Sequence, residues 1–533
     1  MPAVITPTFR RNNAKRIYNA VQSGTEDFYI GIGKNDSWKN DQGVAADDNA
    51  SSYEKPSGSD IQVREALMNL IALKSVNITD SQAEVNVSTD NNVAFVIPHY
   101  RYKTGLKYKA WDPNDTQCFY SDSSTSEQAC YAVVDNSIFI CVRQAKDSVG
   151  SPVASTAVPS SSQQLGVIAT LSDNYSWVKV QDKNVSVSAS SPLESQTLYI
   201  VNHPLYTRSY IPVLGRNTNI QDIAPSFIRF KINSSGQGYA APTAPNTFHT
   251  CKIYGDGTGG VANVSITDGR VSNITLGSEG TGYTYGYIDF SKLTATGTST
   301  PVKPDVELIY TPKNGFGRDP INELPTWFVG FTSVFDGSEL EEFPISTELN
   351  KTDYRQISLI KNPQFNRDGV DPINTTALLR INYTVQSGTE NFSNGDILEF
   401  YSDTAMNNIV GRAHVDFKGT IDPLGVANMP SNFGTPQSLA VDTANTKYIL
   451  VHQNYEVGLG ELNPTSNKPV RFRKISSNNE RTVDTTTVYS VITNGIVEPE
   501  YKRGTGEVLF LENRGPVVRD ASQIEAIKII LQF

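Results

Sequence analysis

The sequence predicts a mainly β protein with a multi-layer (three-layer) β-sandwich core, a few helices and two inserted β modules. Only 19% of its 533 residues are charged, and glycine (38 residues) and proline (28 residues) are frequent, which is typical of many short strands and turns. Three short runs, residues 93–97, 138–142 and 508–511, are apolar at every position. A strand with one wet face alternates apolar and polar residues, so each run requires cover on both faces. We therefore expect three inner strands and at least three stacked layers.

Two helices and one strand are predicted near the N-terminus. Residues 8–22 carry apolar side chains at helical spacing on one face, and residues 27–34 then predict a strand. Ser59 and Gln62 form a capping box ahead of a second apolar periodicity, which predicts a helix over residues 60–74.

Residues 234–300 differ in composition from the rest of the chain and predict an inserted β module. Glycine is dense here, and the aromatic residues are mostly tyrosine. The tetrapeptide at residues 236–239, Gly-Gln-Gly-Tyr, is echoed by Gly-Thr-Gly-Tyr at residues 280–283. Asp268-Gly269 lies between two alternating runs, so a hairpin is predicted over residues 261–276.

A second foreign segment, from about residue 375 to residue 501, predicts another all-β insert. It carries a hairpin signal at Asn394-Gly395 and alternating runs at residues 397–401 and 448–451. The predicted division of the chain has two inserts within one core. The core comprises residues 1–232, 305–374 and 504–533, and the inserts comprise residues 233–304 and 375–503.

Charge and hydropathy limit the classes of partner. The chain has 45 basic and 55 acidic residues and a net charge of −10, which disfavours a nucleic acid partner. It contains no run of eighteen apolar residues and no apolar signal core at its start, so we expect no membrane partner and synthesis in a host cytoplasm. The four cysteines are too few and too widely spaced to staple such a chain, so we expect packed, reduced thiols.

Motifs that carry chemistry are weak in this sequence. Residues 31–34, Gly-Ile-Gly-Lys, lack the spacing of a phosphate loop, and their glycines are better explained by close backbone packing. The five histidines have no partner at metal-ligand spacing, and the glycine- and aspartate-rich residues 255–260 and 367–371 predict turns and not calcium loops. No nucleophile elbow or zinc-protease motif is present. We therefore predict no catalytic residue, no cofactor and no metal site.

Four stretches, in order along the chain, carry a resemblance to a known family. They are residues 16–19 with the strand ending at Gly33-Lys34 and Trp38, residues 173–177, residues 354–363, and residues 506–516. In this order they resemble a baseplate wedge subunit of T-even-type contractile-tailed phages. The resemblance implies a three-layer β-sandwich that forms a homodimer within each baseplate wedge and contacts the other wedge subunits.

The residues matched to the family are interpreted as structural. They are Tyr18, Trp38, Trp177, Arg355, Gln356, Asn362, Pro363, Glu507, Glu512, Asn513, Arg514 and Pro516. After an inner strand, the Arg514 guanidinium can satisfy buried carbonyls or a carboxylate, and Pro516 prevents the strand from continuing. A solvated turn pair of Glu512 and Arg514 is an equal alternative. The following apolar run, residues 524–531, fits a strand and also has helical spacing.

Binding is the function that these observations favour. We expect a structural virion protein of the tail baseplate, assembled in the host cytoplasm, whose 25 tyrosines suit large protein–protein interfaces. Two alternatives remain open. One is a receptor-binding fibre or adhesin component of the tail, and the other is a tail-associated polysaccharide-degrading enzyme.

Overall fold

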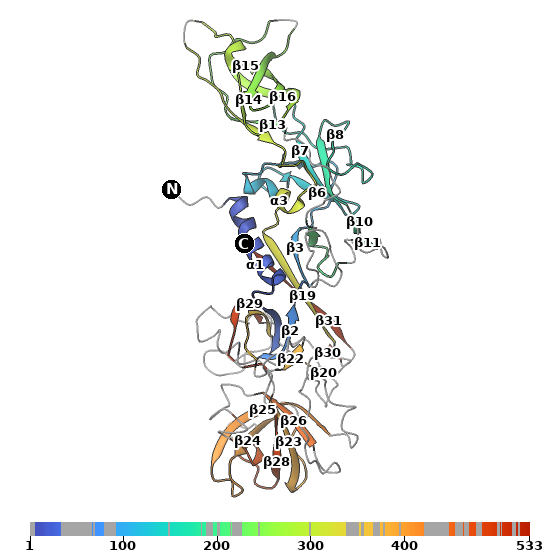
Figure 1. The fold of residues 1–533 in the computed structure, drawn as a ribbon, viewed down its shortest axis with the longest axis vertical. Coiled ribbons are helices and arrows are strands. Elements are labelled where there is room, and N and C mark those ends of the chain that lie inside the picture. The colour runs from blue at the N-terminus through green and yellow to red at the C-terminus, as the bar shows by residue number, and fades with distance from the viewer. Residues whose placement is uncertain are drawn as a thin grey trace. The chain divides into compact units, whose positions relative to one another are not determined.

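The computed structural model confirms a mainly β protein: of the residues that the structure describes, 51% lie in strands and 8% in helices, and the strands form several antiparallel sheets (Figure 1). The structure describes residues 6–33, 67, 70–78, 92–147, 150–182, 184–187, 196–199, 203–213, 215, 226–243, 246–297, 300–336, 351–352, 356–365, 374–376, 379–393, 396–420, 447–452, 462, 468–475, 482–497, 501–502, 504–513, 519–520 and 523–533. Within these residues, no helix is both long and apolar enough to cross a membrane.

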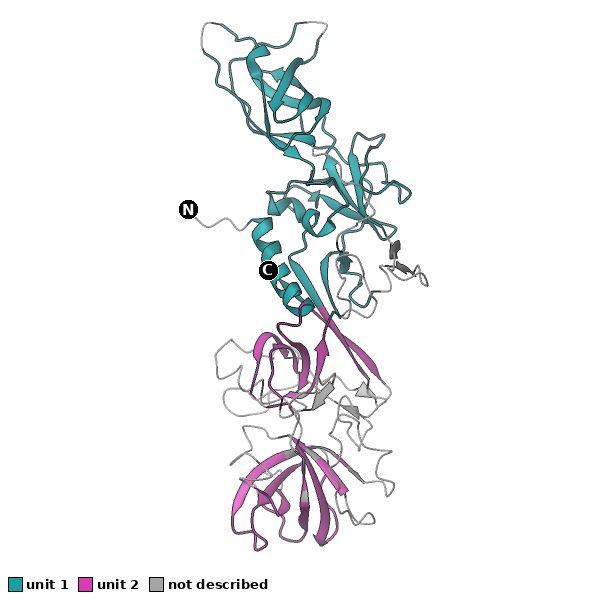
Figure 2. Cartoon of the chain, viewed as in Figure 1, with its two compact units in different colours: residues 1–22, 78–330, 530–533 teal, residues 23–77, 331–529 magenta. Residues whose placement is uncertain are grey.

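The chain divides into two compact units, which Figure 2 distinguishes by colour. Unit 1 comprises residues 1–22, 78–330 and 530–533, and unit 2 comprises residues 23–77 and 331–529. Two of the four boundaries between the units fall within strands, in β19 (Phe328–Asp336) and β31 (Ile524–Gln532). The last apolar run, residues 524–531, fits either a strand or a helix in sequence, and in the structure it forms strand β31.

Inner strands of unit 1 bear out two of the three apolar-run predictions. The four-stranded sheet has the order β6-β7-β9-β8, and β3 pairs with β12. Their bounds are β3 (Val93–Pro98), β6 (Tyr131–Val134), β7 (Ser137–Arg143), β8 (Ile168–Thr170), β9 (Ser176–Gln181) and β12 (Tyr210–Val213). Residues 93–97 and 138–142 are buried at every position, as both-face cover requires.

One helix prediction is confirmed, and the other is wrong at its C-terminal end, although Leu67, within its range, is helical. The first helix, α1 (Pro7–Gln22), is present as predicted, and a second short helix is α3 (Pro320–Glu323). The predicted helix over residues 60–74 is wrong at its C-terminal end, because Leu70–Val76 forms strand β2. β2 pairs along its length with β1 (Phe28–Gly33), so the hydrogen bonds of the sheet override a local helical periodicity. Residues 60–66 lie outside the described residues.

Unit 2 contains a five-stranded antiparallel sheet in the order β22-β2-β1-β21-β29. Its remaining strands are β21 (Gln356–Lys361), β22 (Asn374–Thr376) and β29 (Glu507–Asn513). β1 is fully buried, and β21 is buried over its first five residues. The prediction that residues 508–511 form an inner strand is wrong, because β29 is the last described strand of this sheet and these residues are only half-buried. An apolar run at a sheet edge looks the same in sequence as one at its centre.

Unit 2 also contains a closed six-stranded barrel. Its order is β23-β26-β25-β24-β27-β28. The bounds are β23 (Leu379–Ser387), β24 (Ile397–Tyr401), β25 (Ile409–Thr420), β26 (Lys447–His452), β27 (Arg471–Ile475) and β28 (Val488–Val497). Buried aromatic residues fill it, with the Phe472 and Tyr489 rings stacked at 4.7 Å. Asn394-Gly395 lies outside the described residues, and the strands on either side of it, β23 and β24, pair with other strands and not with each other.

The glycine- and tyrosine-rich segment, which we name the module, lies in unit 1, and its strands share one hydrophobic cluster. The strands of its sheet have the order β16-β15-β14-β17. The strands that precede and follow this sheet in the sequence, β13 and β18, pair with each other in a two-stranded ribbon. The bounds are β13 (Phe227–Ser234), β14 (His249–Gly255), β15 (Thr258–Thr267), β16 (Arg270–Thr281), β17 (Gly286–Ile288) and β18 (Asp305–Tyr310). The predicted hairpin is confirmed: Asp268 and Gly269 both have positive φ, 52° and 72°, as its two-residue turn requires.

The remaining elements are short. They are β4 (Lys107–Tyr108), β5 (Glu127–Gln128), β10 (Asn184–Val187), β11 (Gln196–Tyr199), β20 (Lys351–Thr352), β30 (Arg519–Asp520) and the 3₁₀ turns at Thr116–Phe119 and Phe290–Lys292.

Candidate interaction surfaces

Parts of three of the four stretches that carry the resemblance are neighbours in one sheet of unit 2. Strands β1, β21 and β29 lie side by side, although they come from distant parts of the chain. In the register Gln356 lies opposite Asn513, Glu512 lies opposite Ile357, and Glu507 is paired with the end of β21. The fold therefore brings Gln356, Glu512 and Asn513 together at one end of the strand pair and places Glu507 at the other end.

Other matched residues lie elsewhere. In unit 1 the Tyr18 ring stacks on Phe95 at 4.5 Å, and Trp177 is fully buried in β9. Pro363 is buried just after β21. Four further matched residues lie outside the described residues: Trp38, Arg355, Arg514 and Pro516. The proposed role of the Arg514 guanidinium therefore stays a prediction.

The end of β21 is fixed by backbone and charge. Asn362 has a φ of 50°, its side-chain oxygen accepts a hydrogen bond from the Asp27 N–H (2.8 Å), and its own N–H donates to the Asp27 carbonyl (2.7 Å). The Lys361 Nζ lies 3.0 Å from Glu26 and 3.1 Å from Glu507. Hydrogen bonds to these two carboxylates raise the pKa of Lys361. Lys361 at the end of β21 thus forms ion pairs with Glu507 on β29 and with Glu26, which precedes β1.

Close packing against neighbouring side chains explains the glycine at position 31 of strand β1. A Cβ atom at this position would lie 2.8 Å from the Leu70 side chain and 2.8 Å from the Ser358 Oγ. The Ser358 hydroxyl donates to the Gly31 carbonyl at 3.2 Å. The interpretation of these glycines as a close packing device is therefore confirmed for Gly31.

Strand β29 presents apolar residues at the edge of the sheet. Val508 packs on one side against a cluster that contains Tyr29 and Ile360. All four residues from Val508 to Leu511 nevertheless are only half-buried. An apolar strand at the edge of a sheet is a template for pairing with another chain, and β29 is the last strand of this sheet among the described residues, so it is a candidate docking edge.

The two echoed tetrapeptides of the module share one backbone conformation. The first glycine of each has a φ of 61°, and the second has a φ of 88° (Gly238) or 77° (Gly282). The tyrosine that follows is buried in each case. Gly257, which lies outside both tetrapeptides, faces the Tyr283 ring, and a Cβ atom there would lie 2.5 Å from it. The absence of a side chain at Gly257 therefore leaves the space that this ring fills.

Other tyrosines of the module are exposed on one surface of its sheet. Tyr254 (47% exposed) and Tyr287 (57%) lie opposite each other on β14 and β17, with ring centroids 6.1 Å apart. Tyr285, in the preceding turn, is 62% exposed. The residues that alternate with the module core along this sheet define what we name the tyrosine face. It consists of Thr250, Lys252 and Tyr254 on β14, Val261, Asn263 and Ser265 on β15, Asn273, Thr275 and Ser278 on β16, and Tyr287 on β17.

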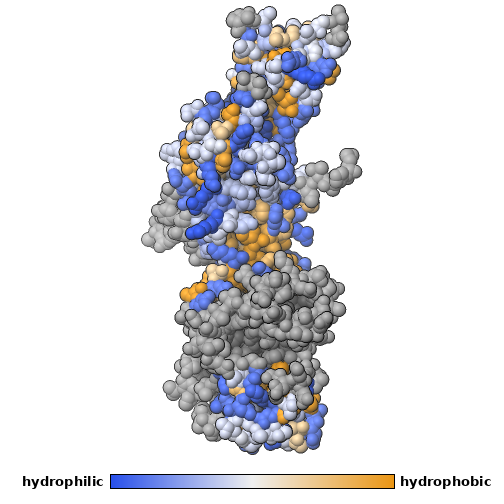
Figure 3. All heavy atoms as spheres, turned by 180° about the vertical axis from the view of Figure 1, so that it is seen from behind, coloured by the Kyte–Doolittle hydropathy of each residue, from blue (hydrophilic) through white to orange (hydrophobic). Residues whose placement is uncertain are grey.

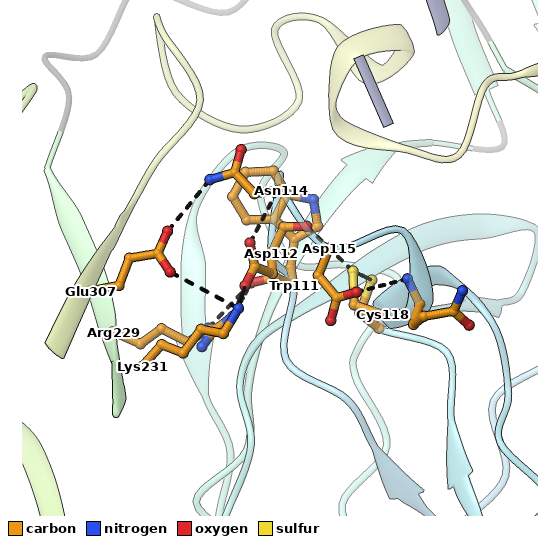
Figure 4. Close-up of polar contacts among 10 residues, drawn as sticks. Trp111, Asp112, Asn114, Asp115, Cys118, Arg229, Lys231 and Glu307 are labelled. Carbon is orange, nitrogen blue, oxygen red and sulfur yellow. Dashed lines mark hydrogen bonds and ion pairs between the residues drawn. The ribbon is translucent and has the colours of Figure 1, made fainter. Parts of the chain in front are cut away.

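A buried charge cluster joins the ribbon β13-β18 to the loop after β4. Figure 4 shows Arg229 and Lys231 reaching toward Asp112, whose side chain is 3% exposed. The Lys231 Nζ lies 3.0 Å from the Asp112 carboxylate, and the Arg229 Nη2 donates to the Trp111 carbonyl at 2.7 Å. The hydrogen bond to Asp112 raises the pKa of Lys231. The cluster positions the module on the rest of unit 1.

The four cysteines are free thiols and all are buried, as predicted. Cys118 and Cys130 lie together, with their sulfur atoms 3.5 Å apart, and burial raises the pKa of the Cys130 thiol well above its ordinary value. The Cys130 thiol is therefore protonated at neutral pH. Among the described residues, no group of three or more histidine, cysteine or acidic side chains is arranged to hold a metal ion.

Sequence reasoning did not identify the tyrosine face or the Asp112 cluster. Alternation of Thr250, Lys252 and Tyr254 with buried residues was a detectable signal for the exposed face. The partners of Asp112 come from a strand far along the chain, so no local pattern indicates them.

Comparison of the sequence with protein families and with curated proteins identifies no relative. No family model matches the chain. No curated protein matches it either.

Proposed function

We propose that the chain is a structural virion protein, a wedge subunit of the baseplate of a contractile phage tail, and that its function is binding and not catalysis. Its partners are other wedge subunits and a second copy of itself, and its surfaces join them through large protein–protein interfaces. The site of action is the virion, after assembly in the host cytoplasm.

One observation carries the proposal. Parts of three of the four stretches that resemble the wedge family lie on neighbouring strands of one sheet, and the last described strand of that sheet, β29, carries an apolar run that is only half-buried. Permanent assemblies commonly bury about 2,000 Å² or more at such surfaces. The surface in Figure 3 also shows one larger group of apolar residues among otherwise mixed polar and apolar ones.

Light scattering and copurification with the tail proteins encoded in the same genome test the proposal. We expect a dimer that captures at least one of them, and we expect Leu509→Lys, which places a charge in the middle of β29, to abolish capture. Val302→Lys is the matched control, because Val302 is 59% exposed on another part of the chain. A protein that is monomeric and captures none of them would contradict the proposal, and an intertwined trimer would favour the receptor-binding alternative.

A further inference from the structure

We propose that the tyrosine face of the glycine-rich module binds a carbohydrate chain. This inference rests on the module alone and does not depend on the wedge assignment.

The aromatic part of the face suits a sugar ring. The Tyr254 and Tyr287 rings lie 6.1 Å apart with 33° between their planes, and about half of each side chain is exposed. An aromatic ring face is electron-rich and attracts the positive edges of C–H bonds. The C–H face of a pyranose offers such bonds, so two adjacent rings form a platform for consecutive sugar units.

The polar part of the face suits hydroxyl groups. Thr250 lies opposite Asn263, and Asn263 lies opposite Thr275, so hydroxyl and amide side chains continue the surface across β14, β15 and β16. Each of these side chains both donates and accepts hydrogen bonds, as sugar hydroxyls do. The defined face has one charge, from Lys252, and the Asp256 carboxylate lies in the turn beside its rings, bound to the Thr284 and Tyr285 N–H groups.

This composition is less suited to a protein partner. The core of a protein interface is enriched in tyrosine but depleted in lysine and serine, whereas the tyrosine face combines two rings and one valine with neutral polar groups, two of them serines, and one lysine. Lys252, next to the ring pair on β14, adds a preference for sugar units that carry a carboxylate.

The platform is held rigidly before any ligand arrives. The Asp256 carboxylate accepts hydrogen bonds from the backbone N–H groups of Thr284 (2.9 Å) and Tyr285 (3.1 Å), which fixes the turn leading into β17. A Cβ atom at Gly255 would lie 2.1 Å from the Tyr285 carbonyl, so the two strands approach closely beside the rings. Such preorganisation lowers the entropic cost of binding.

An array of neutral and acidic bacterial polysaccharides, probed with the purified full chain, tests the inference. We expect binding to one or more of them, weakened about tenfold or more by Tyr254→Ala with Tyr287→Ala and retained by the matched Tyr254→Phe with Tyr287→Phe. Lys252→Gln weakens binding of acidic polysaccharides only. Circular dichroism checks that each variant is folded.

Two results would overturn the inference. One is the absence of binding to every polysaccharide on the array. The other is binding that the folded alanine variant retains in full. Capture of a tail protein through this face, lost in the alanine variant while no polysaccharide binds, would assign the face to a protein partner instead. Failure here leaves the wedge proposal untouched, because that proposal is tested at β29.

Discussion

At the residue scale, glycines with positive φ set the shape of the module. Gly280 has a φ of 61°, and a Cβ atom there would lie 2.6 Å from the Thr258 carbonyl and 2.7 Å from the Gly260 nitrogen. Both the backbone conformation and the space at this position therefore require glycine.

Gly280→Ala is expected to lower the free energy of unfolding by about 2–4 kcal/mol, from backbone strain and overpacking together. Gly297→Ala is the matched control, because Gly297 has a φ of 84° but no atom within 4 Å of its Cβ position. The control should cost only about 1 kcal/mol. Urea denaturation measures both, and equal losses would contradict the steric argument.

A second residue-scale prediction concerns Glu323, a fully buried carboxyl group in unit 1. Burial raises the pKa of Glu323 to about 8, against an ordinary value of 4.5, although the Gly317 and Asp319 N–H groups donate hydrogen bonds to it. Arg11 and Asp319 are the nearby charged groups. The folded state thus keeps a proton that the unfolded chain releases. The stabilisation is complete below about pH 4.5 and is lost as the pH rises toward 8.

The free energy of unfolding of the native chain should therefore fall between pH 5 and pH 8, by up to about 1.4 kcal/mol per pH unit from this group. Glu323→Gln keeps an acceptor oxygen but cannot ionise, so its stability should vary less over that range. Glu279→Gln, at a side chain that is 52% exposed, is the control. Identical pH profiles for native chain and Glu323→Gln would refute the assignment.

At the element scale, the Asp112 cluster anchors the ribbon β13-β18. Asp112→Ala leaves Arg229 and Lys231 without their carboxylate, and we expect a loss of about 2–3 kcal/mol, since Lys231 is partly exposed. Hydrogen exchange should also accelerate in the ribbon. Glu307→Gln, 4.0 Å from the Lys231 Nζ and 37% exposed, should change stability by less than about 0.5 kcal/mol. Unchanged exchange in the Asp112 variant would mean that the cluster does not anchor the ribbon.

Elements that depend on neighbouring residues were predictable, and those that depend on distant partners were not. Helix α1 and the hairpin at Asp268-Gly269 follow from local periodicity and turn chemistry. The segment at Leu70–Val76 became a strand because β1 pairs with it. Of the three apolar runs, only residues 508–511 are half-buried and not fully buried. The sequence of a strand does not show whether the strand lies at the centre or at the edge of its sheet, so this difference could not be predicted. The tyrosine face escaped prediction because it depends on register across four strands.

At the scale of the whole molecule, the barrel is the part that most resembles an independent domain. Its six strands close on themselves, which removes exposed edges. Its core contains tightly packed rings, among them Phe400 and Phe472 at 5.2 Å, and each fully buried aromatic side chain contributes about 1.5–3 kcal/mol. These strands, residues 379–497, all fall within the predicted insert of residues 375–503.

Residues 375–503, expressed alone, are therefore expected to fold, with cooperative thermal unfolding and dispersed amide signals in nuclear magnetic resonance spectra. Phe472→Ala should cost about 3–5 kcal/mol and remove the cooperative transition, because Phe472 is fully buried and its ring is stacked on Tyr489. The matched surface change, Ile409→Ala, should leave the transition in place, since Ile409 is 40% exposed. A fragment without a cooperative transition would show that the barrel needs the rest of unit 2 to fold, and the predicted division of the chain at residues 375 and 503 would then be wrong.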